Sequence, residues 1–292
     1  MRVIVTGASG QLGRRTAEHV LELRGPDGVI LVTRQPESIA DLAAHGADVR
    51  FGDFDQPESL GEAFAGGERM LLISATDLER RVGQHQAAID AAAAAGVRHV
   101  VYTSCLRPEP PNPAVVAASH YATETALVDS GLAWTFLRNS LYAEYQAAEA
   151  AAATASGRLV HNRGDGRVAY VSRDDCAAAA AAVLVGPGHQ ACAYDVTGPE
   201  PFRAAELAAL YGDIGGRAVE VVPLDDDSFV ASLVGNGAAD DHLRYGAELV
   251  ASFGRSIREG HMASCTEIVA TLTGRPARTL REVLEFASRD YA

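Results

Sequence analysis

The sequence predicts an α/β fold: a doubly wound parallel sheet of the Rossmann type with a smaller α/β lobe in the C-terminal part of the chain. Three observations support this prediction. Short runs rich in β-branched residues alternate with amphipathic stretches through the first half of the chain, which is typical of repeated strand–helix units. Three evenly spaced glycines follow the first apolar run directly. The chain has 292 residues, enough for one large domain with an appended lobe.

The first half of the chain predicts six strands separated by helices. The predicted strands cover residues 3–6, 29–34, 47–51, 70–74, 99–104 and 135–137. Helices are predicted from Gln11 onward and over residues 36–45, 57–65, 80–95 and 119–130. In an open parallel sheet, ligands bind beyond the carboxyl ends of the strands. We therefore expect the functional residues to lie just after each strand.

After Asn139 the alternation loosens, which predicts a boundary between a dinucleotide-binding domain (1–139) and a smaller substrate lobe (140–292). Some segments of the second part are expected to return to the sheet. The predicted elements are a helix from about Leu141, a strand at 158–160, a turn at 164–166, an apolar run at 168–171, a helix after Ser172, a strand at 193–196, a helix from about Arg203, a strand at 218–222 and several C-terminal helices.

Composition excludes several classes of function. The net charge is −13 without a basic cluster, which argues against nucleic acids and anionic membranes as partners. There is no apolar run long enough to span a membrane and no segment before the first strand, so a cytoplasmic protein is expected. The four cysteines lack metal-ligand spacing, and no metal site is predicted. All 25 basic residues are arginines, so no mechanism can use a lysine.

The glycine triplet predicts a dinucleotide site. Gly7, Gly10 and Gly13 stand between a buried strand and a helix, the context that a phosphate-binding turn requires. Glycine lets the backbone turn tightly and approach a ligand, and the helix N-terminus offers unpaired N–H groups to a pyrophosphate. The residues expected to contact the dinucleotide here are Gly7, Ser9, Gly10, Gln11, Leu12 and Gly13. A purely structural turn is the alternative.

Residues after the next three strands extend this site. Arg34 closes the second strand where an NAD site usually has an acidic residue, so it favours the 2′-phosphate of NADPH; the alternative is an exposed surface arginine. After the third strand, Asp53 and Phe54 are expected to contact the adenine. After the fourth, the small residues Ser74, Ala75 and Thr76 are expected beside the ribose and nicotinamide.

The chain lacks the tyrosine–lysine pair that short-chain dehydrogenases usually use for proton transfer. Such enzymes pair a tyrosine with a lysine four residues later, but Tyr121 is followed by Thr125 at that spacing. Without the cation, a tyrosine keeps a pKa near 10 and is a poor base at neutral pH. Tyr121 therefore stays a candidate only as a modest donor.

Other candidate catalytic residues lie after the fifth and sixth strands. Ser104 is placed to hydrogen-bond a substrate oxygen; the alternative is that it caps the backbone of its own strand. His120 is a candidate proton donor that Glu124, one helical turn later, would orient or raise in pKa; a solvated pair is the alternative. Asn139 and Tyr142 are candidate pocket walls, with core packing as the alternative.

The sequence resembles the NmrA-like branch of the atypical short-chain dehydrogenases/reductases, and within it the bacterial NADPH:quinone oxidoreductases and triphenylmethane reductases. The similar stretches are TGASGQLG, GDFDQPESL, MLLIS, AAGVRHVVYTS, HYATETALVDSGL, TFLRNSLY and VSRDD. The resemblance implies a Rossmann domain that binds NADPH, a small C-terminal lobe and a substrate cleft between them. Reductases of this kind resemble the chain in having a glutamate where Glu124 stands.

These observations favour an NADPH-dependent reductase of quinones or similar conjugated electrophiles, whose partner is a small molecule. Such acceptors are already activated and need no strong acid. Two alternatives are an NADPH-dependent carbonyl or imine reductase of specialised metabolism and a non-enzymatic NADP(H)-binding redox sensor. A homodimer is the assembly considered.

Overall fold

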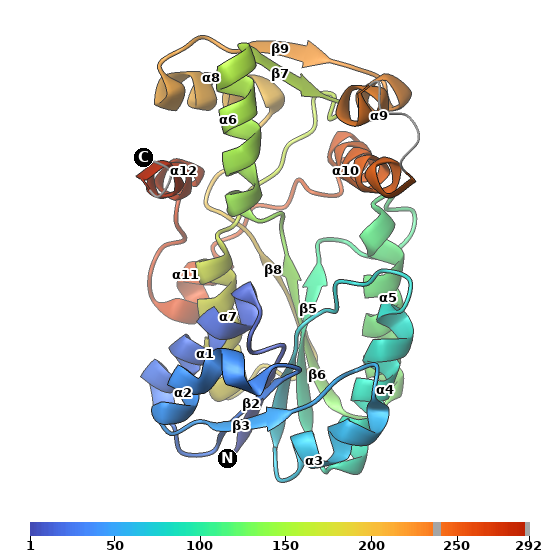
Figure 1. Cartoon of the computed structure of the whole chain (residues 1–292), viewed down its shortest axis with the longest axis vertical. Helices are drawn as coiled ribbons and strands as arrows, with labels where there is room; N and C mark the ends of the chain where they lie inside the picture. Colours follow the sequence, from blue (N-terminus) through green and yellow to red (C-terminus); the bar gives the residue numbers. More distant parts are fainter. Residues whose placement is uncertain (236–240, 290–292) are drawn as a thin grey trace.

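The computed structural model describes residues 1–235 and 241–289 of the chain (Figure 1). Seven strands form one sheet in the order β3-β2-β1-β4-β5-β6-β8, and every neighbouring pair is parallel. The predicted open parallel sheet is therefore confirmed. The strands are β1 (Val3–Thr6), β2 (Val29–Thr33), β3 (Asp48–Phe51), β4 (Arg69–Leu72), β5 (His99–Cys105), β6 (Ala133–Asn139) and β8 (Cys192–Val196).

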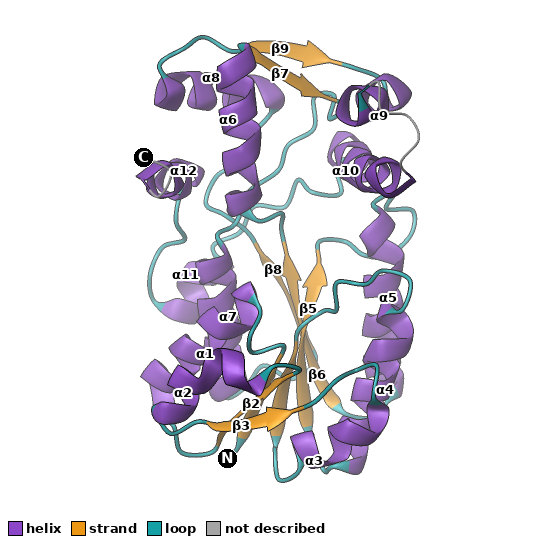
Figure 2. Ribbon diagram, viewed as in Figure 1, coloured by secondary structure: helices purple, strands orange, loops and turns teal. Residues whose placement is uncertain are grey.

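Helices cover both faces of this sheet because its central strands are apolar on both sides (Figure 2). Val3 and Val5 pack towards α1, α2, α7 and α11, while Ile4 packs towards α3, α4 and α5, as the alternation of side chains in a strand requires. On the first face lie α1 (Gln11–Arg24), η1 (Pro36–Ile39), α2 (Ala40–Ala44), α7 (Arg173–Val185) and α11 (Ile268–Thr273). On the second lie η2 (Pro57–Ser59), α3 (Leu60–Phe64), α4 (Arg81–Ala94) and α5 (Val115–Asp129).

The remaining elements form a lobe above the carboxyl ends of the strands. In Figure 2 the arrows of β5 and β8 point towards this lobe. It contains a two-stranded parallel sheet of β7 and β9 and its own apolar core. Its elements are η3 (Ala143–Tyr145), α6 (Gln146–Ser156), β7 (Arg158–His161), α8 (Ala204–Gly215), β9 (Glu220–Pro223), α9 (Asp226–Val234), α10 (Asp241–Arg258) and α12 (Leu280–Arg289).

Three segments beyond Asn139 belong to the main sheet layer rather than to the lobe. Strand β8 extends the sheet beside β6, and α7 and α11 pack on the face that α1 covers. The helix start predicted at Ser172 is confirmed, because the Ser172 side chain accepts a hydrogen bond from the Asp175 N–H. The boundary at 139/140 stays a prediction. No helix among the described residues combines the length and apolar character that crossing a membrane demands.

Two predicted helix starts are wrong. Helix α5 begins at Val115 rather than at residue 119, because a contact from another element caps it: the Val115 N–H donates to Ser252 Oγ of α10. No helix begins at Leu141, because the backbone there bridges to Val171, and a 3-10 turn starts only at Ala143.

Candidate functional site

A cavity of about 530 Å³ lies at the carboxyl ends of β1 to β4. Nine predicted cofactor residues line it: Gly7, Ser9, Gly10, Arg34, Asp53, Phe54, Ser74, Ala75 and Thr76. The cavity has further lining residues that were not predicted from the sequence, among them Thr33, Gly52, Asp77, Arg80 and Gln84. Gln11, Leu12 and Gly13 do not line it. The four strand ends thus form one continuous site, as expected for an extended dinucleotide.

The glycines of the first turn fit a pyrophosphate. Gly7 has φ +60°, a left-handed conformation that favours glycine. A Cβ atom on Gly13 would stand 2.1 Å from the Gly7 carbonyl oxygen, so Gly13 serves the close packing of α1 on the turn rather than ligand contact. Leu12 is buried in the core beneath the helix. Helix α1 begins at Gln11 with no side-chain cap and no acidic residue in its first turn, which leaves its N–H groups available to an anion.

The predicted 2′-phosphate position contains an arginine that is free to bind. The Arg34 side chain makes no hydrogen bond or ion pair within residues 1–235 and 241–289 and is exposed at the cavity. Arg14, in contrast, donates to Glu18 and Asp41. Beside Arg34, Ser9 Oγ and Thr33 Oγ1 are 2.7 Å apart. The residues present therefore fit NADPH, and the assignment of Arg34 to its 2′-phosphate stays a prediction.

At the neighbouring strand end, after β3, the Asp53 side chain makes hydrogen bonds within its own loop. Its carboxylate accepts hydrogen bonds from the Asp55 N–H (3.1 Å) and from Gln56 Nε2 (3.3 Å). Gly52, just before it, packs so closely that a Cβ atom would stand 2.6 Å from Val32 Cγ1. This packing presents Asp53 and Phe54 to the cavity, where the adenine was predicted.

The segment at the nicotinamide end is held by two buried side chains that sequence reasoning missed. The Ala75 N–H donates to His85 Nε2 at 2.9 Å, and the Ala75 carbonyl accepts from Arg81 Nε at 2.7 Å. Arg81 and His85 are buried on the face of α4 that carries Ala88 and Ile89. A charged residue on an apolar helix face was the available sequence signal.

His120 and Glu124 do not form the predicted pair, and that prediction is wrong. His120 Nδ1 lies 2.7 Å from the Tyr102 hydroxyl oxygen, and its Nε2 lies 3.4 Å from Arg81 Nη1. Since a guanidinium only donates, Nε2 accepts and Nδ1 donates its proton to Tyr102. Burial, followed by the Arg81 charge, lowers the pKa of His120 instead of raising it. His120 is thus a neutral, fully partnered residue at neutral pH.

Glu124 binds an arginine of the neighbouring strand. Arg138 donates to it through Nε (3.0 Å) and Nη2 (2.6 Å), and Glu124 is only 4% exposed. Tyr121 lies elsewhere: it is 44% exposed on the outer groove between α4 and α5, beside Gln86 and Thr125. This placement removes Tyr121 from the candidate site, because its hydroxyl lies outside the nucleotide cavity.

Three buried polar atoms at the carboxyl ends of β5 and β6 have no hydrogen-bond partner in the described part of the chain: Ser104 Oγ, Asn139 Oδ1 and Ser140 Oγ. Buried polar atoms are rarely left unpaired in native proteins. Tyr142 follows them, with the Arg173 guanidinium 5.0 Å from its ring centre, and burial raises the pKa of its hydroxyl. The catalytic roles of Ser104, Asn139 and Tyr142 stay predictions.

The buried His85 predicts a specific pH dependence of stability. Burial, with the nearby Arg81 charge, lowers its pKa from the ordinary 6.5 to about 3. Between these values the unfolded chain takes up a proton that the folded chain refuses, so the free energy of unfolding falls as pH falls below 6.5, by at most about 1.4 kcal/mol per pH unit. Urea unfolding of wild type and His85→Gln from pH 7 to pH 4.5 measures this. The variant should lose less stability over the range; parallel curves would contradict the assignment.

Comparison with known proteins agrees with this geometry. A family model described as NAD(P)H-binding matches residues 7–187. The chain is 34% identical over 280 residues to quinone oxidoreductase 2 of Escherichia coli, covering 96% of both sequences, and 28% identical to the NAD(P)H azoreductase of Xenophilus azovorans, again covering 96% of both.

Solved structures give the same result. The NADPH complex of the Escherichia coli quinone oxidoreductase superposes with a TM-score of 0.91 at 34% identity, covering 99% of this chain and 100% of the other. Triphenylmethane reductase of Citrobacter sp., complexed with NADP(H), superposes with a TM-score of 0.88 at 33% identity, covering 98% and 100%. The chain therefore belongs to the NAD(P)H-binding family of oxidoreductases that includes quinone oxidoreductase 2, as its NmrA-like motifs predict.

Proposed function

We propose that this protein is an NADPH-dependent reductase that transfers hydride to a quinone or a similarly activated conjugated electrophile. The observation that carries the proposal is a dinucleotide cavity whose nicotinamide end offers no strong acid: His120 is neutral and fully partnered, and Tyr121 lies on an outer groove. When bound, NADPH supplies the hydride. The chain supplies binding and orientation, through Arg34 at one end and the anchored Ala75 segment at the other.

The chemistry of such acceptors matches a site of this kind. Hydride addition to a quinone yields an aromatic phenolate, and addition to a triarylmethyl cation yields a neutral product. Neither step needs proton transfer in advance, so positioning supplies most of the catalysis. The relatives named for quinone, azo-compound and triphenylmethane reduction all act on conjugated electrophiles.

The unpaired polar atoms at the carboxyl ends of β5 and β6 mark where the acceptor is expected. Ser104 has a hydroxyl proton to donate, while Asn139 Oδ1 accepts. We assign Ser104 and Asn139 the task of holding polar groups of the acceptor or of the nicotinamide, with Tyr142 as a wall. Ser140 was not singled out in the sequence, because a serine after a strand carries no distinctive signal.

The test is NADPH oxidation, followed by the loss of NADPH absorbance, with a panel of quinones, triarylmethane and azo dyes, aldehydes and imines. Turnover with quinones or dyes, and little with isolated carbonyls, supports the proposal. NADPH binding without acceptor-dependent oxidation would instead identify a redox sensor. A preference for aldehydes or imines would identify a carbonyl or imine reductase. The homodimer stays a prediction, which sedimentation equilibrium measures.

Cofactor choice should depend on Arg34. Arg34→Ala is expected to weaken NADPH binding about 10- to 100-fold, the value of charge-assisted hydrogen bonds to one phosphate, while NADH binding changes little. Fluorescence titration of both nucleotides measures this. The matched control is Arg80→Ala, because Arg80 lines the same cavity but pairs with Asp55 and Asp77. Equal weakening of NADPH and NADH by Arg34→Ala would refute the phosphate contact.

A further inference from the structure

A second hollow, also of about 530 Å³, lies between the first two turns of α1 and the start of α7. Its lining residues are Gln11, Arg14, Arg15, Glu18 and Arg173. It shares none of these residues with the nucleotide cavity. Helices α1 and α7 pack side by side on one face of the sheet (Figure 1), so side chains from both helices reach the same hollow. Apart from Gln11, which begins the helix end expected to face the cofactor pyrophosphate, none of these residues has a part in the reductase chemistry above.

Arg173 lines this hollow, and contacts with two tyrosine rings fix the orientation of its guanidinium. Its guanidinium carbon lies 5.0 Å from the ring centre of Tyr142 and 4.7 Å from that of Tyr145. Its side chain is 13% exposed. The nearest carboxylate, Glu144, is 4.0 Å from Nη1, beyond hydrogen-bonding distance. Glu144 is occupied by the backbone N–H of Arg173, at 2.9 and 3.2 Å. The guanidinium is therefore held in place while its N–H donors stay unused.

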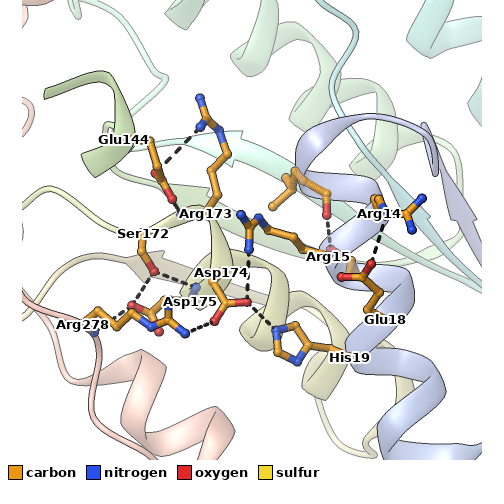
Figure 3. A network of polar contacts seen from close by, with 12 residues as sticks. Arg14, Arg15, Glu18, His19, Glu144, Ser172, Arg173, Asp174, Asp175 and Arg278 are labelled. Atoms are coloured by element: carbon orange, nitrogen blue, oxygen red, sulfur yellow. Dashed lines mark hydrogen bonds and ion pairs between the residues drawn. The ribbon is translucent and has the colours of Figure 1, made fainter. Parts of the chain in front are cut away.

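Arg15, on α1, is more exposed, but its guanidinium also makes no hydrogen bond to a carboxylate. Its nearest carboxylate, Asp174, is also 4.0 Å away. Figure 3 shows that Asp174 has other cationic partners besides Arg15: its carboxylate binds His19 at 2.9 Å and Arg278 at 2.9 Å. The hydrogen bond from His19, reinforced by the arginine charges, lowers the pKa of Asp174 to about 2. Within residues 1–235 and 241–289, neither the Arg15 nor the Arg173 guanidinium donates a hydrogen bond.

The third arginine of the hollow differs from these two. Arg14 donates to Glu18 within α1 and to Asp41 of α2. Its charge is therefore balanced by two carboxylates, and it offers few hydrogen-bond donors to a ligand in the hollow. The open capacity of the hollow consists of two guanidinium forks, contributed by different helices, in a chain whose net charge is −13.

We propose that Arg15 and Arg173 form a binding site for a phosphate group, separate from the phosphates of the cofactor. A tetrahedral dianion matches two planar forks approaching from different helices, because it offers acceptor oxygens in several directions. Two sources share this chemistry: inorganic phosphate, and a phosphate carried by the acceptor. The second source rests on the proposed reductase function and is consistent with Tyr142, which lies under Arg173 and comes three residues after the end of β6, where the acceptor is expected.

The site is tested without turnover, by calorimetric titration of inorganic phosphate into protein saturated with NADPH, in low-salt buffer at pH 8. Binding is expected, and Arg15→Gln and Arg173→Gln should each weaken it about tenfold or more, the value of one charge-assisted contact. Arg173→Lys, which keeps the charge but not the fork, should weaken it less. Thermal unfolding of each variant checks that it is folded. The control is Arg281→Gln, because Arg281 pairs with Asp213 on the surface of α12 and α8.

Two outcomes would overturn the site. Phosphate that binds only in the absence of NADPH belongs to the cofactor cavity. Phosphate binding that Arg15→Gln and Arg173→Gln leave unchanged belongs elsewhere. Failure here leaves the proposed reductase activity untouched, because that activity is measured with uncharged quinones.

The source of the phosphate is decided by kinetics with a naphthoquinone bearing an alkyl phosphate side chain and its uncharged parent. A rise in KM confined to the phosphorylated quinone in Arg173→Gln, with kcat retained, supports an acceptor phosphate. An equal KM for both quinones in wild type and variant overturns that source and leaves inorganic phosphate as the ligand.

Discussion

Gly13→Ala is expected to abolish measurable NADPH binding and to lower the free energy of unfolding by about 3 kcal/mol. The added Cβ atom would stand 2.1 Å from the Gly7 carbonyl oxygen and 2.7 Å from its carbonyl carbon. Both are backbone atoms of the turn that leads into α1, so relief requires the helix to move away from the turn. That movement displaces the N–H groups expected to hold the pyrophosphate. Urea unfolding and fluorescence titration with NADPH measure the two effects.

The matched control for this substitution is Gly83→Ala. Gly83 lies within α4, and a Cβ atom added there would meet nothing within 4 Å. Alanine is the better helix former, so the control should be stabilised by about 0.5–1 kcal/mol and should bind NADPH normally. If Gly13→Ala bound NADPH with the wild-type affinity, the close approach of α1 to the turn would not be what forms the site.

Arg138→Met is expected to destabilise the protein by about 3–5 kcal/mol, because it leaves Glu124 as a buried carboxylate without its partner. Glu124 is 4% exposed and accepts two hydrogen bonds from Arg138. The pair joins α5 to the carboxyl end of β6, next to the unpaired Ser104 and Asn139. Its loss is therefore also expected to lower turnover, through misplacement of that strand end. Urea unfolding and the quinone assay measure these effects.

A double variant shows whether the loss of stability in Arg138→Met comes from the unpaired Glu124 carboxylate or from the lost packing of the arginine stem. Replacing Glu124 by leucine together with Arg138→Met removes both charges, and exchange of a buried ion pair for apolar residues is often close to neutral. Stability should then recover most of the way. A double variant as unstable as Arg138→Met would show that the cost lies in lost packing of the arginine stem, not in an isolated carboxylate.

Most of the sheet could be predicted because its strands are local apolar runs. Val3 to Thr6 is a stretch of β-branched residues followed by glycines, and a central parallel strand needs no more than that to be recognised. The cofactor cavity followed from the same regularity, since parallel strands end at one edge and the residues after them must meet there. The predicted start of a helix was wrong where a group distant in the sequence determines it, as Ser252 does for the helix that begins at Val115.

The predicted pairing of His120 with Glu124 failed for a related reason. His120 and Glu124 are one helical turn apart, as predicted, yet each bonds to a residue of another element: His120 to Tyr102 of β5 and to Arg81 of α4, and Glu124 to Arg138 of β6. Spacing along a helix specifies a shared face but not the groups that face meets. Those groups lie 14 to 39 positions away in the chain.

The sequence by itself determined the parallel sheet, the glycine turn and the run of strand-end residues that form the nucleotide cavity, because each depends on neighbours in the chain. Only the tertiary structure decided which arginine side chains form hydrogen bonds with carboxylates and which keep their donors available. Arg14, Arg34 and Arg173 look alike in the sequence, but Arg14 is neutralised by Glu18 and Asp41, while Arg34 and Arg173 keep their donors. An arginine can bind a phosphate only where the fold brings no carboxylate within reach of its hydrogen bonds, and long-range packing sets that distance.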